Sequence, residues 1–383
     1  MKILFSGFEQ LCGKYGIVSV SPLLKGWSGD QKYILKEILT VISKEKPDGL
    51  LIAGDIYDRS VPSEDAMRLW DDFLISLSEK KIPVFAISGN HDSAIRFADH
   101  GRLMDVSGIH LSPVYDGQTH FFSLTDGSIT VNIYMLPFVK PAVIRSIFPD
   151  EEINDYTDAC RVAIRHMAID ADRLNILIAH QFVTGATRCE SEEVVVGGLD
   201  NVDASVFDVF DYVALGHIHG KQKIGRDTIR YCGTPLKYSF SEKDHLKSIT
   251  VLNIDQDQNI SIDEIPLTPM RDLREIRGTY EELTLKQNYE NTDTNDYIHA
   301  VLTDENDIID AVSKLRTVYP NLMKLSYDNA RTRENRSVDT AEAIEQRSPL
   351  DLFMEFYEIQ NNAPMSDEQK SFLTECIESV WEA

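Results

Sequence analysis

The sequence lacks the features that mark membrane-spanning, secreted and thiolate-metal proteins. It has no apolar run of about 18 residues or more, so no membrane-spanning helix is expected. Its five cysteines are odd in number and never form a Cys-x-x-Cys pair, which argues against a disulfide framework or a thiolate zinc site and for a reducing cytoplasm. The apolar start at residues 1–5 is too short for a signal peptide. We therefore expect a cytoplasmic protein without membrane association.

Positive charge is also scarce. The chain has 38 Lys and Arg residues against 62 Asp and Glu residues, a formal net charge of −24. Proteins that bind nucleic acids usually carry a basic face, so a chain this acidic that acts on DNA needs bound cations, a local basic patch or a basic partner. The alternative is that the acidity serves solubility alone, since net charge governs association and not fold.

What the sequence does contain is an alternation of short apolar runs and amphipathic helical patterns. The helical spacing predicts helices over 31–46, from an N-cap at Ser63 to about 79, and over 91–105. The apolar runs predict strands at 49–53, 83–87, 174–179 and 211–215. This mixture is typical of a layered α/β fold.

The chain is long enough for more than one domain. Pro266 and Pro269 mark a boundary, and a polar stretch marks a linker. We predict a layered domain, a small α/β cap, a polar linker and a helical tail, at 1–265, 266–327, 328–347 and 348–383. The tail includes a capping box at 366–369 that opens its second helix. Its two short apolar-faced helices either bind a partner or dock on the first domain.

Four predicted strands end in side chains that can bind a metal. Amide, imidazole and carboxylate groups are costly in a core but well placed for a site at a strand end. The candidates are Asp55, Asn90, His91, His180, His217 and His219. A single histidine there is more often a satisfied polar residue, and an isolated aspartate often forms a turn. Their conjunction at successive strand ends favours one site assembled across a sheet.

Oxygen and imidazole ligands without a thiolate suit Mn²⁺, Fe²⁺ or Zn²⁺. His217 and His219 can serve two neighbouring metals, with Asp55 as the bridging carboxylate. Two metals about 3.5–4 Å apart clamp the attacking water and the leaving oxygen of a phosphoester. His91, beside Asn90, is placed to stabilise charge on the phosphate or to protonate the leaving group.

The motifs at 54–55, 89–92, 180 and 216–219 resemble those of the calcineurin-like metallophosphoesterases. Their extended forms, with the segment 231–236, are more narrowly similar to the D subunits of bacterial SbcCD nucleases. The resemblance implies a four-layer α-β-β-α domain, two Mn²⁺ ions, and ATP-dependent double-strand exonuclease and single-strand endonuclease activity in DNA end processing, recombination and repair. The implied partners are DNA and an SbcC-type coiled-coil ATPase, in a heterotetramer with two copies of each subunit. The tail helices would bind the coiled coil.

The resemblance also implies a role for each candidate residue. Asp55 bridges the two metals, and His91 is the catalytic histidine. The remaining ligands are Asn90, His180 and His217 at one metal and His219 at the other.

One family motif is missing. Family members carry Asp-x-His after the first strand, whereas here Glu9 and Leu11 stand at those positions if residues 13–14 are aligned with the family's Gly-Lys. The match resumes at Asp30. Either the first 29 residues carry a sequence or reading-frame error, or the first metal site is incomplete, with Glu9 as a candidate substitute ligand.

We therefore expect a Mn²⁺-dependent DNA phosphodiesterase, the nuclease subunit of an ATPase complex. Two alternatives stay open: a catalytically impaired subunit that binds DNA and its partner, and a small-molecule phosphodiesterase of the same fold. The cap and the tail argue against the second alternative, because a minimal phosphatase needs neither.

Overall fold

The computed structural model describes most of the chain, in two compact units. The described residues are 1–6, 27–192 and 201–330, with short pieces of the tail at 353–354, 357, 365–366 and 369–373. The first unit contains residues 1–275, 293–299 and 319–324, and the second contains residues 276–292, 300–318 and 325–383. All six candidate residues at the strand ends belong to the first unit.

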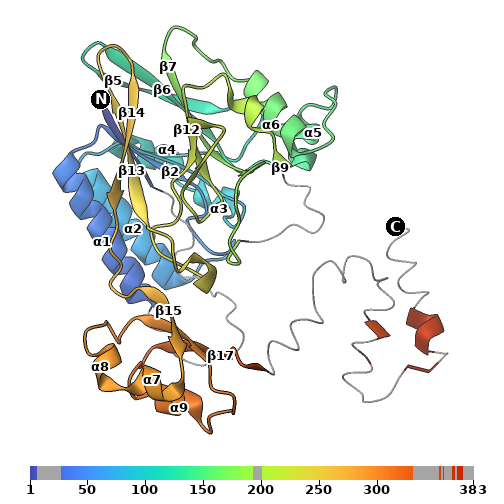
Figure 1. The fold of residues 1–383 in the computed structure, drawn as a ribbon. Coiled ribbons are helices and arrows are strands. Elements are labelled where there is room, and N and C mark those ends of the chain that lie inside the picture. Colours follow the sequence, from blue (N-terminus) through green and yellow to red (C-terminus); the bar gives the residue numbers. More distant parts are fainter. Residues whose placement is uncertain are drawn as a thin grey trace. The chain divides into compact units, whose positions relative to one another are not determined.

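Over the described residues, the first unit is built on two six-stranded sheets (Figure 1). The first sheet has the order β14-β13-β1-β2-β3-β4. Its strands are β1 (Lys2–Ser6), β2 (Gly49–Ala53), β3 (Val84–Ile87), β4 (Ile109–Leu111), β13 (Ser248–Ile254) and β14 (Ile260–Pro266). The four strands from β1 to β4 are parallel, so their carboxyl ends share one edge.

The second sheet has the order β11-β12-β10-β7-β6-β5. Its strands are β5 (His120–Asp126), β6 (Ile129–Leu136), β7 (Leu174–His180), β10 (Tyr212–Gly216), β11 (Gln222–Ile224) and β12 (Arg226–Tyr231). The central strands β6, β7, β10 and β12 are parallel, and β5 and β11 pair antiparallel at the two edges. A short parallel pair joins β8 (Phe182–Val183) to β9 (Asn201–Val202).

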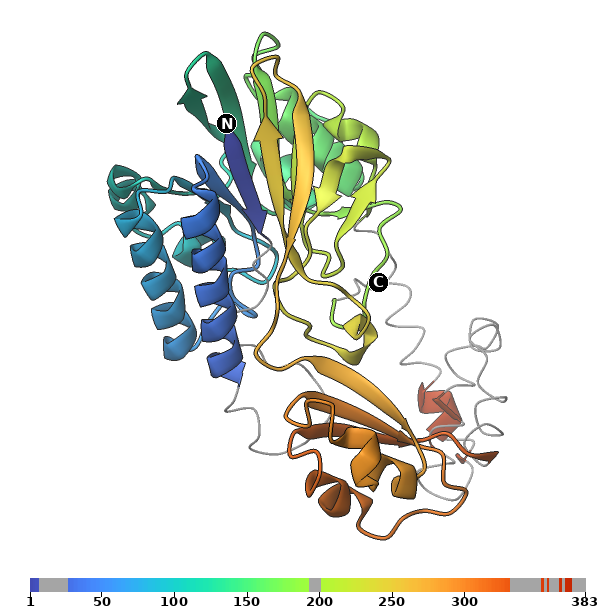
Figure 2. The same ribbon diagram turned by 60° about the vertical axis from the view of Figure 1, so that its left-hand side comes forward.

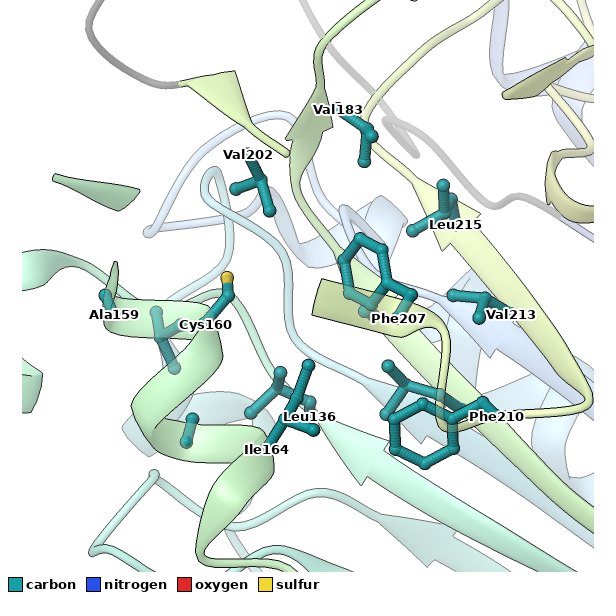
Figure 3. Packing of buried hydrophobic residues seen from close by; sticks show 14 of the residues in the cluster. Leu136, Ala159, Cys160, Ile164, Val183, Val202, Phe207, Phe210, Val213 and Leu215 are labelled. Carbon is teal, nitrogen blue, oxygen red and sulfur yellow. The ribbon is translucent and has the colours of Figure 1, made fainter. Parts of the chain in front are cut away.

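Three hydrophobic clusters show that the two sheets are stacked between helices. One cluster joins the first sheet to α1 (Trp27–Glu45) and α2 (Glu64–Glu79), and a second fills the space between the sheets. The third joins the second sheet to α5 (Pro141–Ile147) and α6 (Tyr156–Arg165). Figure 3 shows this third cluster, with the α6 residues Ala159, Cys160 and Ile164 facing the strands. The α-β-β-α order of layers is therefore confirmed.

Strand β2 shows how the sequence positions the site. Leu50 and Ile52 face the helices, whereas Leu51 and Ala53 face the second sheet. Because successive side chains of a strand point to opposite faces, a strand covered on both faces reads as a continuous apolar run. Polar side chains are then tolerated only beyond the strand end, where Asp55 follows.

The helix at 63–79 is confirmed, and the one at 91–105 is wrong. Ser63 caps α2 by accepting a hydrogen bond from the Ala66 N–H at 3.2 Å. The second segment forms two single turns, α3 (Ala94–Phe97) and α4 (Gly101–Met104), broken at His100, whose φ is +60°. Phe97 is the one buried side chain on these two turns, so no continuous apolar face stabilises a longer helix. Among the described residues, 3₁₀ turns follow at η2 (Asp105–Ser107), η3 (Ala204–Phe207) and η4 (Phe240–Glu242).

A third sheet follows the two large ones in sequence, with the strand order β15-β16-β17 (Figure 2). Its elements are β15 (Leu273–Gly278), α7 (Tyr280–Thr284), α8 (Lys286–Tyr289), β16 (Tyr297–Leu302), α9 (Ala311–Arg316) and β17 (Leu322–Tyr327). In the tail, Ser366 and Gln369 exchange the two hydrogen bonds of the predicted capping box. The domain boundaries near 265, 327 and 347 stay predictions, and residues 331–352 lie outside the described part.

The expectations that the chain has no membrane-spanning helix and no disulfide framework can be compared with the described residues alone. None of the described helices is both long and apolar enough to cross a membrane. The cysteines in this part, Cys160, Cys189 and Cys232, form no disulfide bond.

Candidate metal centre

The ends of four parallel strands bring four predicted ligands to one point. Asp55 follows β2, Asn90 follows β3, His180 is the last residue of β7, and His217 follows β10. The strands β2, β7 and β10 pack against one another although they belong to different sheets. Across the two sheets, His180 Nδ1 lies 2.7 Å from the Ala53 carbonyl oxygen, so the strand ends are directly joined.

The donor atoms of these four residues converge. Asn90 Oδ1 lies 2.9 Å from His180 Nε2 and 3.0 Å from His217 Nδ1. Asp55 Oδ2 lies 3.2 Å from His180 Nε2. Ligand atoms of Asp55, His180 and His217 all lie within 4.8 Å of one another. Ligands about 2.1 Å from a shared ion at right angles to one another are about 3 Å apart, so this spacing fits a coordination site.

The protonation of His180 provides an independent test of whether a cation fits. A carbonyl oxygen only accepts hydrogen bonds, so the Ala53 carbonyl requires the proton on Nδ1. The Nε2 lone pair of the neutral ring then faces the oxygens of Asn90 and Asp55, which also carry lone pairs. A cation between these atoms converts mutual repulsion into ligation. The residues therefore fit a divalent metal.

Three glycines leave the space that this convergence needs. A Cβ on Gly89 would lie 2.0 Å from Asp55 Oδ1, and a Cβ on Gly216 would lie 1.8 Å from the Ala53 carbonyl oxygen. Gly54 has φ of +92°, and a Cβ there would lie 2.5 Å from His180 Nδ1. Any side chain at these positions would push the ligands apart. The glycines in the motifs are therefore part of the site's geometry.

Two of the candidate ligands hold a backbone conformation that residues other than glycine rarely adopt. Asp55 has φ of +49° and His217 has φ of +101°. Such residues cost of order 1–3 kcal/mol each and persist where the surroundings over-determine them, typically at functional sites. The sharp turn at each strand end directs the side chain into the convergence point, and this positioning explains why the strain is tolerated.

A buried carboxylate next to the ligands organises the loop after β2. Asp92 accepts hydrogen bonds from the backbone N–H groups of Ile56, Tyr57 and Gly89 at 2.9–3.1 Å. Burial and the facing Asp55 carboxylate raise the pKa of Asp92 above its ordinary range. The sequence reasoning placed Asp92 in a motif without giving it a role. Its position three residues after Gly89, in a tight turn, was the available signal.

The carboxyl group of Asp55 stays ionised in this environment. Burial raises its pKa, but the His180 and His91 rings in their protonated forms, together with the His91 backbone N–H, hold the pKa of Asp55 below its ordinary range in the metal-free protein. The His91 N–H donates to Asp55 Oδ1 at 2.9 Å. An ionised carboxylate next to two imidazoles is the donor set expected of a site for a divalent transition metal.

His91 lies beside the convergence point, next to Asp55. Its Nδ1 is 3.0 Å from the Asp58 carbonyl oxygen, and its Nε2 is 3.9 Å from Asp55 Oδ2. The side chain keeps 11% of its surface exposed, more than the 0% of His180. The ring is thus partly open to solvent beside Asp55, and its catalytic role stays a prediction.

His219 is held differently from the other candidates. It is not part of the three-residue metal-capable group found in the described chain. Its Nδ1 lies 2.7 Å from Ser191 Oγ and 3.2 Å from Glu242 Oε1. Sequence reasoning missed both partners, and its assignment of His219 to a metal stays a prediction. Glu9 and the rest of the missing first motif lie outside the described residues.

An aromatic side chain contacts each of the two candidate histidine ligands. Phe138 contacts the His180 ring edge-on at 6.1 Å between centroids, and Phe182 contacts His217 in the same way at 6.3 Å. The guanidinium of Arg188 lies 3.5 Å over the Phe182 ring. A positive charge is therefore held next to the site in an otherwise acidic protein.

Comparisons with known proteins agree with this geometry. Residues 28–221 match the calcineurin-like phosphoesterase family, and residues 269–361 match the type 5 capsule protein repressor C-terminal domain. The chain is 35% identical over 301 residues to the D subunit of the SbcCD nuclease of Staphylococcus epidermidis, covering 78% of this chain and 79% of that one. This chain belongs to the SbcD family. Its calcineurin-like domain contains the convergence point, so the family is one of metal-dependent phosphoesterases.

Two solved structures were compared as well. One is TT1561 of Thermus thermophilus, with a TM-score of 0.38 and 11% identity over 69% of this chain and 98% of that one. The other is a dimetal phosphatase from Danio rerio, with a TM-score of 0.40 and 10% identity over 70% and 98% of the two chains.

Proposed function

We propose that this SbcD family member is the nuclease subunit of an ATP-dependent complex and hydrolyses DNA phosphodiester bonds with Mn²⁺. The observation that carries the proposal is the convergence of donor atoms from Asp55, Asn90, His180 and His217 at the ends of four parallel strands. The proposed partner is a coiled-coil ATPase of the SbcC type, bound by residues 348–383. The complex would contain two copies of each subunit, act in the cytoplasm, and process DNA ends in recombination and repair.

The chain's own residues account for binding and orientation. When bound, the metal ions supply Lewis-acid polarisation of the phosphate and of the attacking water. The Ala53 carbonyl fixes the His180 tautomer, so that Nε2 is available as a ligand. The ionised Asp55 carboxylate supplies the negative charge that retains the ions. His91, partly exposed beside Asp55, would contact the phosphate or give a proton to the leaving oxygen.

The acidity of the chain sets a further condition on DNA binding. A net charge of −24 repels a polyanion. Attraction for DNA must then come from the bound ions, from the ATPase subunit and from local cations such as Arg188 beside the site. We therefore expect weak, strongly salt-dependent DNA binding by the isolated chain and much tighter binding by the complex.

The test is cleavage of linear double-stranded DNA by the full chain mixed with its ATPase partner, ATP and Mn²⁺. His217→Ala should abolish cleavage, because it removes a ligand. His100→Ala is the matched control, because this exposed histidine precedes α4 and is not one of the candidate ligands. Equal cleavage by wild type and His217→Ala would refute the assigned site.

The same assay separates the two alternatives. A catalytically impaired subunit, which the missing first motif favours, would bind DNA and the ATPase partner but would not cleave the DNA. A small-molecule phosphodiesterase would hydrolyse bis(p-nitrophenyl) phosphate at full rate without the partner and leave linear DNA intact.

A further inference from the structure

A buried network of charged and polar groups lies around His219, and the proposed chemistry does not use it directly. Glu242, Lys247 and Ser191 have exposed fractions of 0%, 7% and 2%. Lys247 Nζ donates to Glu242 Oε2 at 2.6 Å, and Ser191 Oγ donates to Glu242 Oε1 at 2.7 Å. Burying two opposite charges costs desolvation energy and is weak evidence for a stability role. The pair therefore calls for a functional explanation.

The backbone of His219 is fixed at both of its polar groups. Its N–H donates to Glu192 Oε1 at 2.7 Å. Its carbonyl oxygen accepts from Lys247 Nζ at 3.0 Å and from the Thr234 N–H at 3.1 Å. These contacts leave the main chain at His219 little freedom to rotate.

The segment at 231–236, which carries part of the family resemblance, packs against the main chain of His219. Gly233 has φ of +74°, and a Cβ there would lie 2.5 Å from the His219 carbonyl oxygen. Thr234 Oγ1 accepts from Lys247 Nζ at 2.6 Å and donates to the Leu236 carbonyl at 2.6 Å. The motif thus connects the His219 main chain to the Glu242–Lys247 pair.

The ring of His219 is fixed by hydrogen-bond direction. The Ser191 hydroxyl gives its proton to Glu242 Oε1, so its oxygen is an acceptor toward His219 Nδ1 at 2.7 Å. Glu242 Oε1 is a second acceptor, 3.2 Å from the same nitrogen. Two acceptors at Nδ1 require the proton there, and the lone pair of the neutral ring is then on Nε2. The Tyr238 ring packs edge-on against the imidazole at 6.0 Å.

We propose that Glu242, with Lys247 and Ser191, is a positioning device that fixes His219 in its Nδ1–H form and thereby makes Nε2 the atom that binds the second metal ion. The inference rests on the proposed function and on the sequence-based assignment of His219 to that ion. Histidine ligands of metals commonly donate their other N–H to a carboxylate, and losing that partner costs about 10- to 100-fold in metal affinity. Lys247 balances the buried carboxylate's charge and ties it to the His219 backbone.

The first variant is Glu242→Gln, which keeps the shape and removes the charge. A second variant, Glu242→Leu with Lys247→Met, removes both charges together, so that no unpaired ammonium is left buried. Glu264→Gln is the matched control, because Glu264 is a partly exposed carboxylate on β14 that pairs with Lys221 and Arg230. All are made in the full-length chain, and a thermal melt checks that each is folded.

Two measurements test the proposal. ¹⁵N NMR of histidine-labelled, metal-free protein reads the His219 tautomer, with His219→Asn to assign the signal. Mn²⁺ titration calorimetry reads the number of ions and their affinities. We expect the Nδ1–H form in wild type and a mixed or Nε2–H form in the double variant. The second ion should bind about 10- to 100-fold more weakly in that variant, with the first ion's affinity unchanged.

The outcomes separate this proposal from the proposed function. An Nε2–H tautomer in wild type, a single bound Mn²⁺ ion in wild type, or an unchanged second ion in the folded double variant would each overturn the positioning role. Two ions and the Nδ1–H tautomer without any DNA cleavage by the complex would instead refute the nuclease function and leave the positioning role supported.

Discussion

The sharpest prediction concerns a substitution that removes no ligand. Gly89→Ala adds one methyl group, whose Cβ would lie 2.0 Å from Asp55 Oδ1 and 2.5 Å from the Asp55 backbone nitrogen. Ordinary contact begins at 3.4 Å, so the Cβ and the carboxylate oxygen must separate by roughly 1.4 Å. Neither residue can move aside easily. The Gly89 N–H donates a hydrogen bond to Asp92, and the Asp55 side chain is buried.

The displacement has two consequences of different size. A misplacement of about 1 Å at a catalytic group costs about 100-fold in rate. Overpacking of a dense region costs about 1–3 kcal/mol of unfolding free energy, which leaves a domain of this size folded. We therefore expect Gly89→Ala to lose about 100-fold in Mn²⁺-dependent DNA cleavage while remaining folded.

The assay compares cleavage rates and thermal melts of Gly89→Ala and Gly29→Ala in the assembled complex. Gly29 is the matched control, because it lies exposed on α1 with no atom within 4 Å of an added Cβ. Gly29→Ala should keep full activity and gain up to about 1 kcal/mol from helix propensity. Full activity in Gly89→Ala would mean that Asp55 tolerates a shift of this size, and the argument from convergent donor distances would be wrong.

Three further predictions follow from other parts of the chain. His91→Ala should leave Mn²⁺ affinity within about 2-fold and lower turnover by about 100- to 10,000-fold, the range for general acid–base catalysis; loss of bound metal in calorimetry would make His91 a ligand instead. Burial and the nearby Glu192 and Glu242 carboxylates raise the pKa of Cys189 to about 12, so at pH 8 its thiol stays protonated and should react with iodoacetamide far more slowly than free cysteine; mass spectrometry showing rapid labelling at pH 8 would contradict this. Deleting residues 348–383 should leave the thermal melt of the first unit intact and abolish co-purification with the ATPase, and retained co-purification would place the partner site elsewhere.

The strand ends could be predicted because each depends on a local rule. A strand buried on both faces reads as an unbroken apolar run, and the first polar side chain after it marks the sheet edge. Parallel strands bring Asp55 and Asn90 to one edge of the first sheet and His180 and His217 to one edge of the second sheet. The stacking of the two sheets then joins the two pairs. The Ser63 cap was predictable from an equally local rule, whereas the layer order was implied by the family resemblance.

The supporting contacts could not be predicted in this way. Asp92 bonds to residues 35 and 36 positions earlier, and Ser191 meets Glu242 across 51 positions. Such pairs follow from how the loops pack, and no periodicity or spacing in the sequence reports them. The break at His100 was missed for a different reason. The left-handed backbone at this residue does not alter the spacing of apolar residues, which is the signal used to predict a helix.

The most direct test of the metal centre is anomalous diffraction from crystals of the full chain grown with Mn²⁺. We predict an anomalous peak about 2.0–2.3 Å from donor atoms of Asp55, Asn90, His180 and His217. A map in which Mn²⁺ is absent from this position, with the four side chains in place, would contradict the claim that these strand ends form the metal centre.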